Sequence, residues 1–154
     1  MSSRGIRGAA AGAMPVAQAR IAYSVGRLER ALRRRLALVT RRFGLTVAQY
    51  TALSVLHARG ALSNAELARR SFVSPQAMNE LLAALARARM IVRRPDERHG
   101  RIVQMTLTPR GARTLAGCDA AVAAVEERML AELSQAARAR LRENLRRCIA
   151  ALER

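Results

Sequence analysis

Residues 62–111 contain two sequences typical of capped helix starts, followed by two short apolar runs typical of strands. Few folds have two short helices followed by two strands in this order. The first start, Ser63-Asn64-Ala65-Glu66, is a capping box, in which a hydroxyl and a carboxylate each satisfy a backbone N–H group. The second is Ser74-Pro75, where serine can cap and proline takes the first helical position, which needs no N–H group. The pattern predicts two short helices, the first ending near Arg70.

The apolar period changes after Met90 from that of a helix to that of a strand. Residues 91–94 read as a short strand ended by Pro95, and residues 102–107 alternate as a second strand. The polar segment 96–101 between them contains a glycine and reads as a hairpin tip. The apolar positions of the second strand should share one face: Val103, Met105 and Leu107.

Helical patterns flank this segment on both sides. Residues 16–39 and 47–58 are helical by period, as are 109–131 and 135–152. Phe72 and Val73, in the turn between the two capped helices, are expected to be buried between them. The last helix carries a coiled-coil-like seam at four-three-four spacing, formed by Leu141, Leu145, Cys148 and Leu152. We therefore expect a mostly α fold with a small β-hairpin (α+β), which is the order of a winged helix-turn-helix.

The charge indicates a polyanionic partner. Among 154 residues, 28 are basic and 11 are acidic, for a net charge of +17, and every basic residue is Arg. A codon preference for Arg can explain the absence of Lys, but not the sign of the charge. Residues 112–154 are nearly balanced, so we expect a protein–protein surface there. Without Lys, a P-loop lysine or a Schiff-base lysine is impossible.

Several functional classes are excluded by what the chain contains. The two cysteines, Cys118 and Cys148, form no C-x-x-C pair and have no nearby histidine cluster, so we expect no metal site and no disulfide framework. Both should be buried small apolar residues. No apolar run is long enough to span a membrane, and residues 1–15 read as a disordered basic arm. We expect a cytoplasmic protein that has no cofactor and is not an enzyme.

Three motifs in order and at the right spacing resemble those of the MarR family of winged-helix transcription regulators, over residues 16–153. They are Leu45-Thr46…Gln49-Tyr50…Leu53…Leu56, then Leu62-Ser63…Glu66-Leu67-Ala68, and finally Asp96-x-Arg98-x-x-Arg101…Leu107-Thr108-x-x-Gly111. The resemblance implies one domain over residues 16–154, in which residues 16–42 and 112–154 are dimerisation helices and residues 45–111 are a DNA-binding lobe. It also implies a homodimer.

The chemistry of DNA predicts which residues would touch it. Amides suit adenine and a carboxylate suits cytosine in the major groove, which points to Gln76, Asn79 and Glu80. Helix N-termini can bind phosphates, which points to Ser63 and Ser74. At the hairpin tip Arg98 can enter a narrow minor groove, and Arg93, Arg94 and Arg101 would follow the phosphates. The resemblance adds Asp96 as the residue that orients an Arg.

Two features depart from the family pattern. Arg89 stands where the second helix of the pair usually ends in glycine, so either this residue is strained or the helix ends differently. The groove-facing side of that helix carries an acidic residue, Glu80, and two alanines without polar groups, Ala83 and Ala84. We therefore predict DNA binding without naming the bases that are read.

The resemblance also implies release of DNA by a small phenolic or carboxylate effector. Residues that would line its pocket are Tyr23, Arg27, Tyr50 and His57; ordinary packing of amphipathic helices is the alternative for each of them. The chain is thus expected to be a sequence-specific repressor on a palindromic duplex operator. The alternative is an architectural nucleic-acid-binding protein of low specificity, which the charge also favours.

Overall fold

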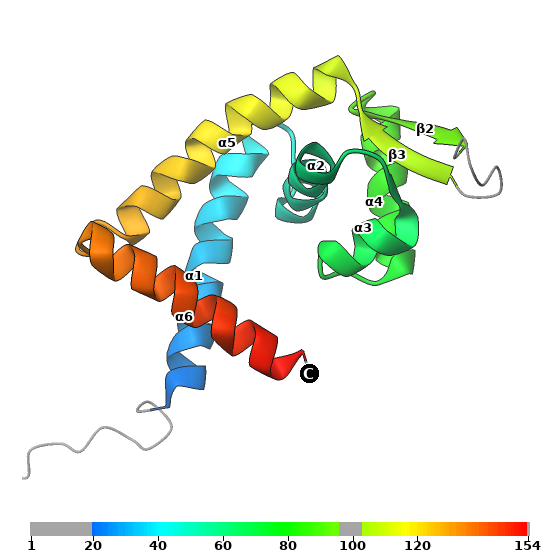
Figure 1. Cartoon of the computed structure of the whole chain (residues 1–154). Helices are drawn as coiled ribbons and strands as arrows, with labels where there is room; N and C mark the ends of the chain where they lie inside the picture. The colour runs from blue at the N-terminus through cyan, green and yellow to red at the C-terminus, as the bar shows by residue number, and fades with distance from the viewer. Residues whose placement is uncertain (1–19, 96–102, 154) are drawn as a thin grey trace, which may run out of the picture. The chain divides into compact units, whose positions relative to one another are not determined.

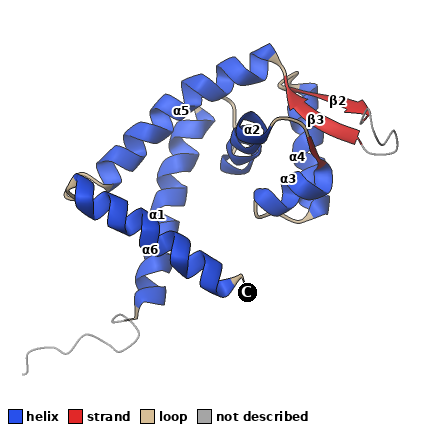
Figure 2. Ribbon diagram, in the orientation of Figure 1, coloured by secondary structure: helices blue, strands red, loops and turns tan. Residues whose placement is uncertain are grey.

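The computed structural model describes residues 20–95 and 103–153. Within them lie six helices and three strands (Figures 1 and 2). They follow in the order α1 (Ile21–Arg41), α2 (Val47–Arg59), β1 (Leu62–Ser63), α3 (Asn64–Arg70), α4 (Pro75–Arg87), β2 (Ile91–Pro95), β3 (Val103–Leu107), α5 (Pro109–Met129) and α6 (Gln135–Leu152). The mostly helical class with a small sheet is confirmed. The residues up to Arg34 form one compact unit, and residues 35–154 form another.

The sheet has three antiparallel strands in the order β1-β3-β2, where the sequence predicted a two-stranded hairpin. β2 and β3 pair from Ile91 with Leu107 to Pro95 with Val103, so the proline is the last residue of its strand. β1 adds two pairs on the other edge of β3, one of which joins Leu62 to Met105. A strand of two residues has no alternation to detect, which is why the sequence did not predict it.

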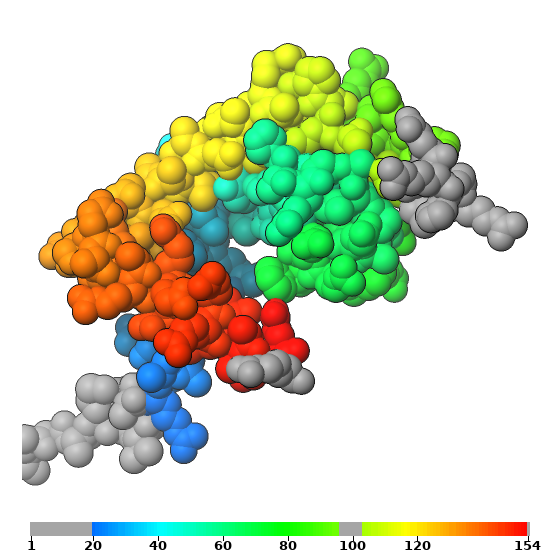
Figure 3. Space-filling model, viewed as in Figure 1, coloured from blue at the N-terminus to red at the C-terminus, as the bar shows by residue number. Residues whose placement is uncertain are grey.

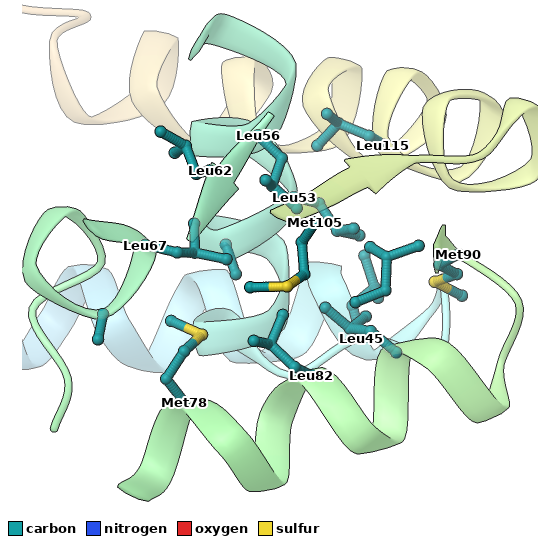
Figure 4. Close-up of a cluster of buried hydrophobic side chains, with 14 of the residues drawn as sticks. Leu45, Leu53, Leu56, Leu62, Leu67, Met78, Leu82, Met90, Met105 and Leu115 are labelled. Atoms are coloured by element: carbon teal, nitrogen blue, oxygen red, sulfur yellow. The ribbon is translucent and has the colours of Figure 1, made fainter. Parts of the chain in front are cut away.

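The core of the second unit lies where α2, α3, α4, α5 and the sheet meet (Figure 4). On the inner face of α4, Met78, Leu82 and Leu85 are buried. In the space-filling view α3 and α4, in green, are tightly packed (Figure 3). On β3, however, only Met105 is fully buried, and Val103 is exposed because it pairs with Pro95 at the far end of the sheet.

The turn between α3 and α4 differs from its prediction. Val73 packs against the core as expected, but Phe72 is 86% exposed. Its φ of 57° is left-handed, so the chain turns back sharply and the Val73 N–H reaches the Ala68 carbonyl at 3.2 Å. The prediction for Phe72 was wrong because this backbone buries one apolar residue of the turn and leaves the other in solvent.

The two cysteines also differ from each other. Cys118 on α5 is fully buried, as predicted, and burial raises the pKa of its thiol. Cys148 on α6 is exposed, so its predicted burial is wrong for the single chain. Cys148 is exposed because it lies on α6, a helix in which no residue is buried.

In the described part of the chain, no helix has the length and apolar character that crossing a membrane requires.

Candidate nucleic-acid interface

The first capped helix, α3, begins with the predicted capping box. The Ser63 N–H donates to Glu66 Oε2 at 3.0 Å, and the Glu66 N–H donates to Ser63 Oγ at 3.4 Å. The Ser63 hydroxyl also donates to the same carboxylate at 2.7 Å. These bonds, first of all the one from the hydroxyl, lower the pKa of Glu66. The Ser63 hydroxyl is therefore engaged within its own helix start.

An amide pair holds α3 against α4. Asn64, the first residue of α3, donates from Nδ2 to Asn79 Oδ1 at 2.5 Å and lies 3.5 Å from the Pro75 carbonyl. Asn79 Oδ1 thus accepts one bond within the protein, and its NH₂ group could donate to another partner. Asn64 adds a side-chain contact between the two helices, although the sequence analysis placed it only in a cap.

The start of α4 presents the polar face that the sequence predicted. The Ser74 hydroxyl accepts the Ala77 N–H at 3.1 Å and caps the helix. Gln76 and Glu80 are exposed, as is Asn79. Because Met78 and Leu82 are buried on the opposite side, this face is fixed in its orientation relative to the core.

Arg93 and Arg94 are exposed on β2, opposite Met105 and Gln104 of β3. They share a hollow of about 400 Å³ with Asn64 and Asn79, and four apolar side chains complete its lining: Leu82, Pro95, Val103 and Met105. The hairpin-tip predictions, Asp96, Arg98 and Arg101, lie outside the described residues.

The end of α4 is joined to the start of α5 by Thr108. Arg89 has a φ of 56°, so the strain expected where the family has glycine is present. The Thr108 hydroxyl donates to the Arg89 carbonyl at 2.7 Å and accepts the Gly111 N–H at 3.0 Å. A Cβ at Gly111 would lie 2.0 Å from the Met90 carbonyl oxygen, so only glycine fits this approach.

Of the four predicted effector residues, Tyr50 has a well-defined partner. Its hydroxyl donates to Asp119 Oδ1 at 2.8 Å and so connects α2 with α5. Burial, followed by the hydrogen bond to Asp119, raises the pKa of Tyr50 to about 12. Asp119 was not singled out from the sequence, because nothing local marks a partner 69 positions away.

The other predicted effector residues do not meet in one described hollow. His57, with Leu56, Thr106 and Thr108, borders a hollow of about 330 Å³ at the end of α2. Tyr50 does not border it. Tyr23 and Arg27 lie in the first unit, on α1, where the Tyr23 side chain is half-exposed.

Comparison with known proteins gives consistent matches. A model of the MarR family matches residues 43–102. The HTH-type transcriptional repressor Rv2887 of Mycobacterium tuberculosis (strain ATCC 25618 / H37Rv) is 35% identical over 114 residues, which are 74% of this chain and 82% of that protein.

Two solved structures of MarR family protein Rv2887 from Mycobacterium tuberculosis, each 32% identical in sequence, resemble the fold. Its complex with DNA has a TM-score of 0.72 and covers 84% of this chain and 98% of its own. Its complex with salicylic acid has a TM-score of 0.69 and covers 84% of this chain and 96% of its own.

Proposed function

Because the chain belongs to the MarR family, we propose that it is a dimeric transcriptional repressor that binds a palindromic operator and releases it when a small aromatic carboxylate binds. The observation that carries the proposal is the exposed polar face of α4, which shares a hollow with two exposed arginines and is bonded to α3 through Asn79 and Asn64. The relative of similar sequence and fold has been solved with DNA and with salicylic acid.

In the proposed complex α4 enters the major groove by its N-terminal turns. Gln76 is exposed and offers both a donor and an acceptor, the combination that suits adenine. Asn79 Oδ1 already accepts one bond from Asn64, and the Asn79 NH₂ group could donate to a base or a phosphate. Glu80 would accept from a cytosine amine, and Ser74 would lie close to a phosphate.

The arginines of the hairpin would bind the DNA backbone. Arg93 and Arg94 lie on the strand that leads to the hairpin tip and are free to reach phosphates. We keep Arg98 as the residue that enters the minor groove, with Arg101 on a phosphate and Asp96 orienting an arginine.

Residues 16–42 and 112–154 would form the dimer, which sets the two α4 helices about one turn of DNA apart, roughly 34 Å. The relative's salicylic acid suggests the effector class, an aromatic ring with a carboxylate. The four residues predicted for the effector stay candidates, and those in the second unit, Tyr50 and His57, do not border one described hollow. Such a repressor would work in the cytoplasm.

The test separates sequence reading from charge-driven binding. Sites are selected from a random duplex pool, and the dissociation constant for the best site is compared with that for random duplex over a range of salt. We expect a preference of at least about 10³ for the selected site. A ratio near one with a steep salt dependence would instead identify an architectural protein of low specificity.

Two matched variants refine that test. Gln76→Ala should weaken binding to the selected site by roughly 10-fold or more and leave random duplex unchanged, because it removes a base contact. Arg93→Ala should weaken both by the same factor and reduce the salt slope by about one, because it removes a phosphate contact. Equal losses on both duplexes for Gln76→Ala would mean that α4 does not read bases.

A further inference from the structure

Two non-glycine residues among those described have a left-handed backbone, and they bracket α4. Phe72 lies just before it, with a φ of 57°, and Arg89 lies just after it, with a φ of 56°. For an ordinary residue this conformation is less favourable than the usual helical one, because the Cβ atom lies too close to the following carbonyl oxygen. Strain of this kind persists where the surrounding structure or a function requires it.

The same pair of backbone hydrogen bonds ends α3 and α4. After α3, the Phe72 and Val73 N–H groups return to the Arg69 and Ala68 carbonyls. After α4, the Arg89 and Met90 N–H groups return to the Ala86 and Leu85 carbonyls. In this motif the left-handed position is normally glycine.

The chain uses glycine for this purpose elsewhere. After α1, the N–H groups of Gly44 and Leu45 return to the Arg41 and Thr40 carbonyls, and Gly44 has a φ of 70°. The left-handed position of that turn therefore carries no side chain. Phe72 and Arg89 differ from Gly44 because each carries a side chain at the left-handed position.

The structure accounts for Arg89 but not for Phe72. The Arg89 carbonyl is fixed by the Thr108 hydroxyl at 2.7 Å, which ties this turn to the start of α5. The Phe72 N–H reaches its acceptor only at 3.5 Å, and the side chain is 86% exposed. Phe72 thus combines backbone strain with an aromatic ring in water, and neither stabilises the fold.

The surroundings of Phe72 indicate what the ring meets. Arg69 and Arg70, in the last turn of α3, are exposed beside it. The cap of α4, Ser74, follows two residues later, so Phe72 lies within about 7 Å of that helix start along the chain. An apolar ring among cations at the entry of a groove-binding helix has one apolar partner on the major-groove edge of DNA, the methyl group of thymine.

We propose that Phe72 contacts the C5-methyl group of a thymine at the edge of each half-site and thereby determines part of the sequence preference. The contact rests on the proposed function, because it requires α4 to lie in the major groove. Phe72 would add an apolar contact beside the base contacts of α4, at a turn where glycine would satisfy the backbone better.

The test removes the methyl group and the ring separately. In the duplex selected by the wild-type protein, each thymine is replaced in turn by uracil, which lacks only that methyl. Affinities of the wild type and of Phe72→Ala are then measured for every duplex. The Phe72 side chain is 86% exposed, so the variant should fold, and its thermal unfolding is recorded as a check.

We expect one symmetry-related thymine pair at which uracil weakens wild-type binding by about fourfold per methyl, the effect of one buried methyl-sized group. The same replacement should leave Phe72→Ala unchanged, because its ring is already absent. Phe72→Leu should keep most of the preference, since it retains an apolar side chain. Phe72→Gly should unfold at a higher temperature than the wild type and still lose the preference, because glycine relieves the strain.

Other outcomes overturn the proposal. If Phe72→Ala binds every duplex as the wild type does, the ring does not touch DNA. If it binds all duplexes more weakly but uracil has the same effect on both proteins, the ring contacts the sugar-phosphate backbone. If Phe72→Ala weakens the dimer in sedimentation experiments, the ring belongs to a subunit contact. If the wild type selects no site, the proposed function fails, and Phe72 has no base to read.

Discussion

At the scale of single residues, the hydrogen bond between Tyr50 and Asp119 joins two side chains that are 69 positions apart in the chain. It connects α2, at the edge of the DNA-binding lobe, with the middle of α5. The hydroxyl is partly buried, and Asp119 lies on an exposed face of α5 next to the buried Cys118. A ligand that separated these two groups would loosen α2 from α5.

Replacement of Tyr50 by Phe tests this contact through pH. The folded-state pKa of Tyr50 is about 12 and its ordinary value is 10, so the folded protein holds this proton more tightly than the unfolded chain. The stabilisation is present below pH 10 and is lost as pH rises toward 12. We expect the unfolding free energy of the wild type to fall more steeply than that of Tyr50→Phe over this range.

At neutral pH, Tyr50→Phe should lose about 1 kcal/mol in chemical denaturation, as for one hydrogen bond. Tyr23→Phe is the matched control, because it removes the chain's other tyrosine hydroxyl, on α1. Identical pH profiles for Tyr50→Phe and the wild type would mean that the bond to Asp119 adds no stability in solution.

At the scale of elements, the end of α4 and the start of α5 form one joint. Thr108 caps α5 and holds the Arg89 carbonyl, while its N–H donates to the Met90 carbonyl at 3.0 Å. Gly111 lies directly against that same carbonyl. The close approach explains why the signature Leu107-Thr108-x-x-Gly111 needs a small hydroxyl residue and a glycine at these two positions.

Gly111→Ala should therefore be severely destabilising. The added Cβ would meet the Met90 carbonyl oxygen at 2.0 Å, and a backbone atom cannot move aside as the end of a flexible side chain can. We expect a loss of about 3 kcal/mol in denaturant unfolding, at the upper end for overpacked sites.

Gly26→Ala is the control, because its Cβ would meet nothing within 4 Å and it lies inside α1. It should gain up to about 1 kcal/mol, since alanine is the better helix former. If the two alanine variants were equally stable, α5 would not approach Met90 as closely as described.

Local chemistry explains which elements could be predicted from sequence. The caps Ser63 and Ser74 follow from residues within one turn of each other, so their predictions were correct. Phe72 and the strand β1 could not be predicted, because their states depend on a left-handed turn and on pairing with β3 some 40 positions away. Asp119 was missed for the same reason.

In the candidate site, too, local features could be predicted from the sequence and contacts between helices could not. The exposure of Gln76, Asn79 and Glu80 follows from helical period, and the structure agrees with it. The engagement of Asn79 by Asn64 depends on how two helices cross, which no spacing reveals. Whether these residues touch DNA stays a prediction.

At the scale of the whole molecule, α6 is an amphipathic helix with no buried residue. Leu145 and Leu152 of the predicted coiled-coil-like seam are 42% and 89% exposed, and Ile149, which was not part of that prediction, is 53% exposed on the same side. A second copy of the chain would cover this face in the proposed dimer. The near balance of charge over residues 112–154 reduces the repulsion that would oppose such an association.

Ile149→Glu should shift the chain from dimer toward monomer, because it places a charge in the centre of that apolar side. The oligomeric state is measured by analytical ultracentrifugation over a range of concentrations. Arg147→Glu is the control, since this exposed residue lies on the opposite side of α6 and makes a larger change of charge. If Ile149→Glu leaves the dissociation constant of the dimer unchanged, the subunit contact lies on another surface.

The strand β1 is only two residues long, but it couples the movement of α3 to that of the sheet. Ser63 belongs both to the edge of the sheet and to the cap of α3, so the strand ends where the helix begins. Tilting α3 would break the pairing of Ser63 with Gln104, and tilting α4 would break the amide pair that joins it to α3. The hairpin and the two helices should therefore move as one rigid body. An effector would then act by changing how two such bodies are placed in the dimer, and their separation would no longer match the spacing of the operator half-sites.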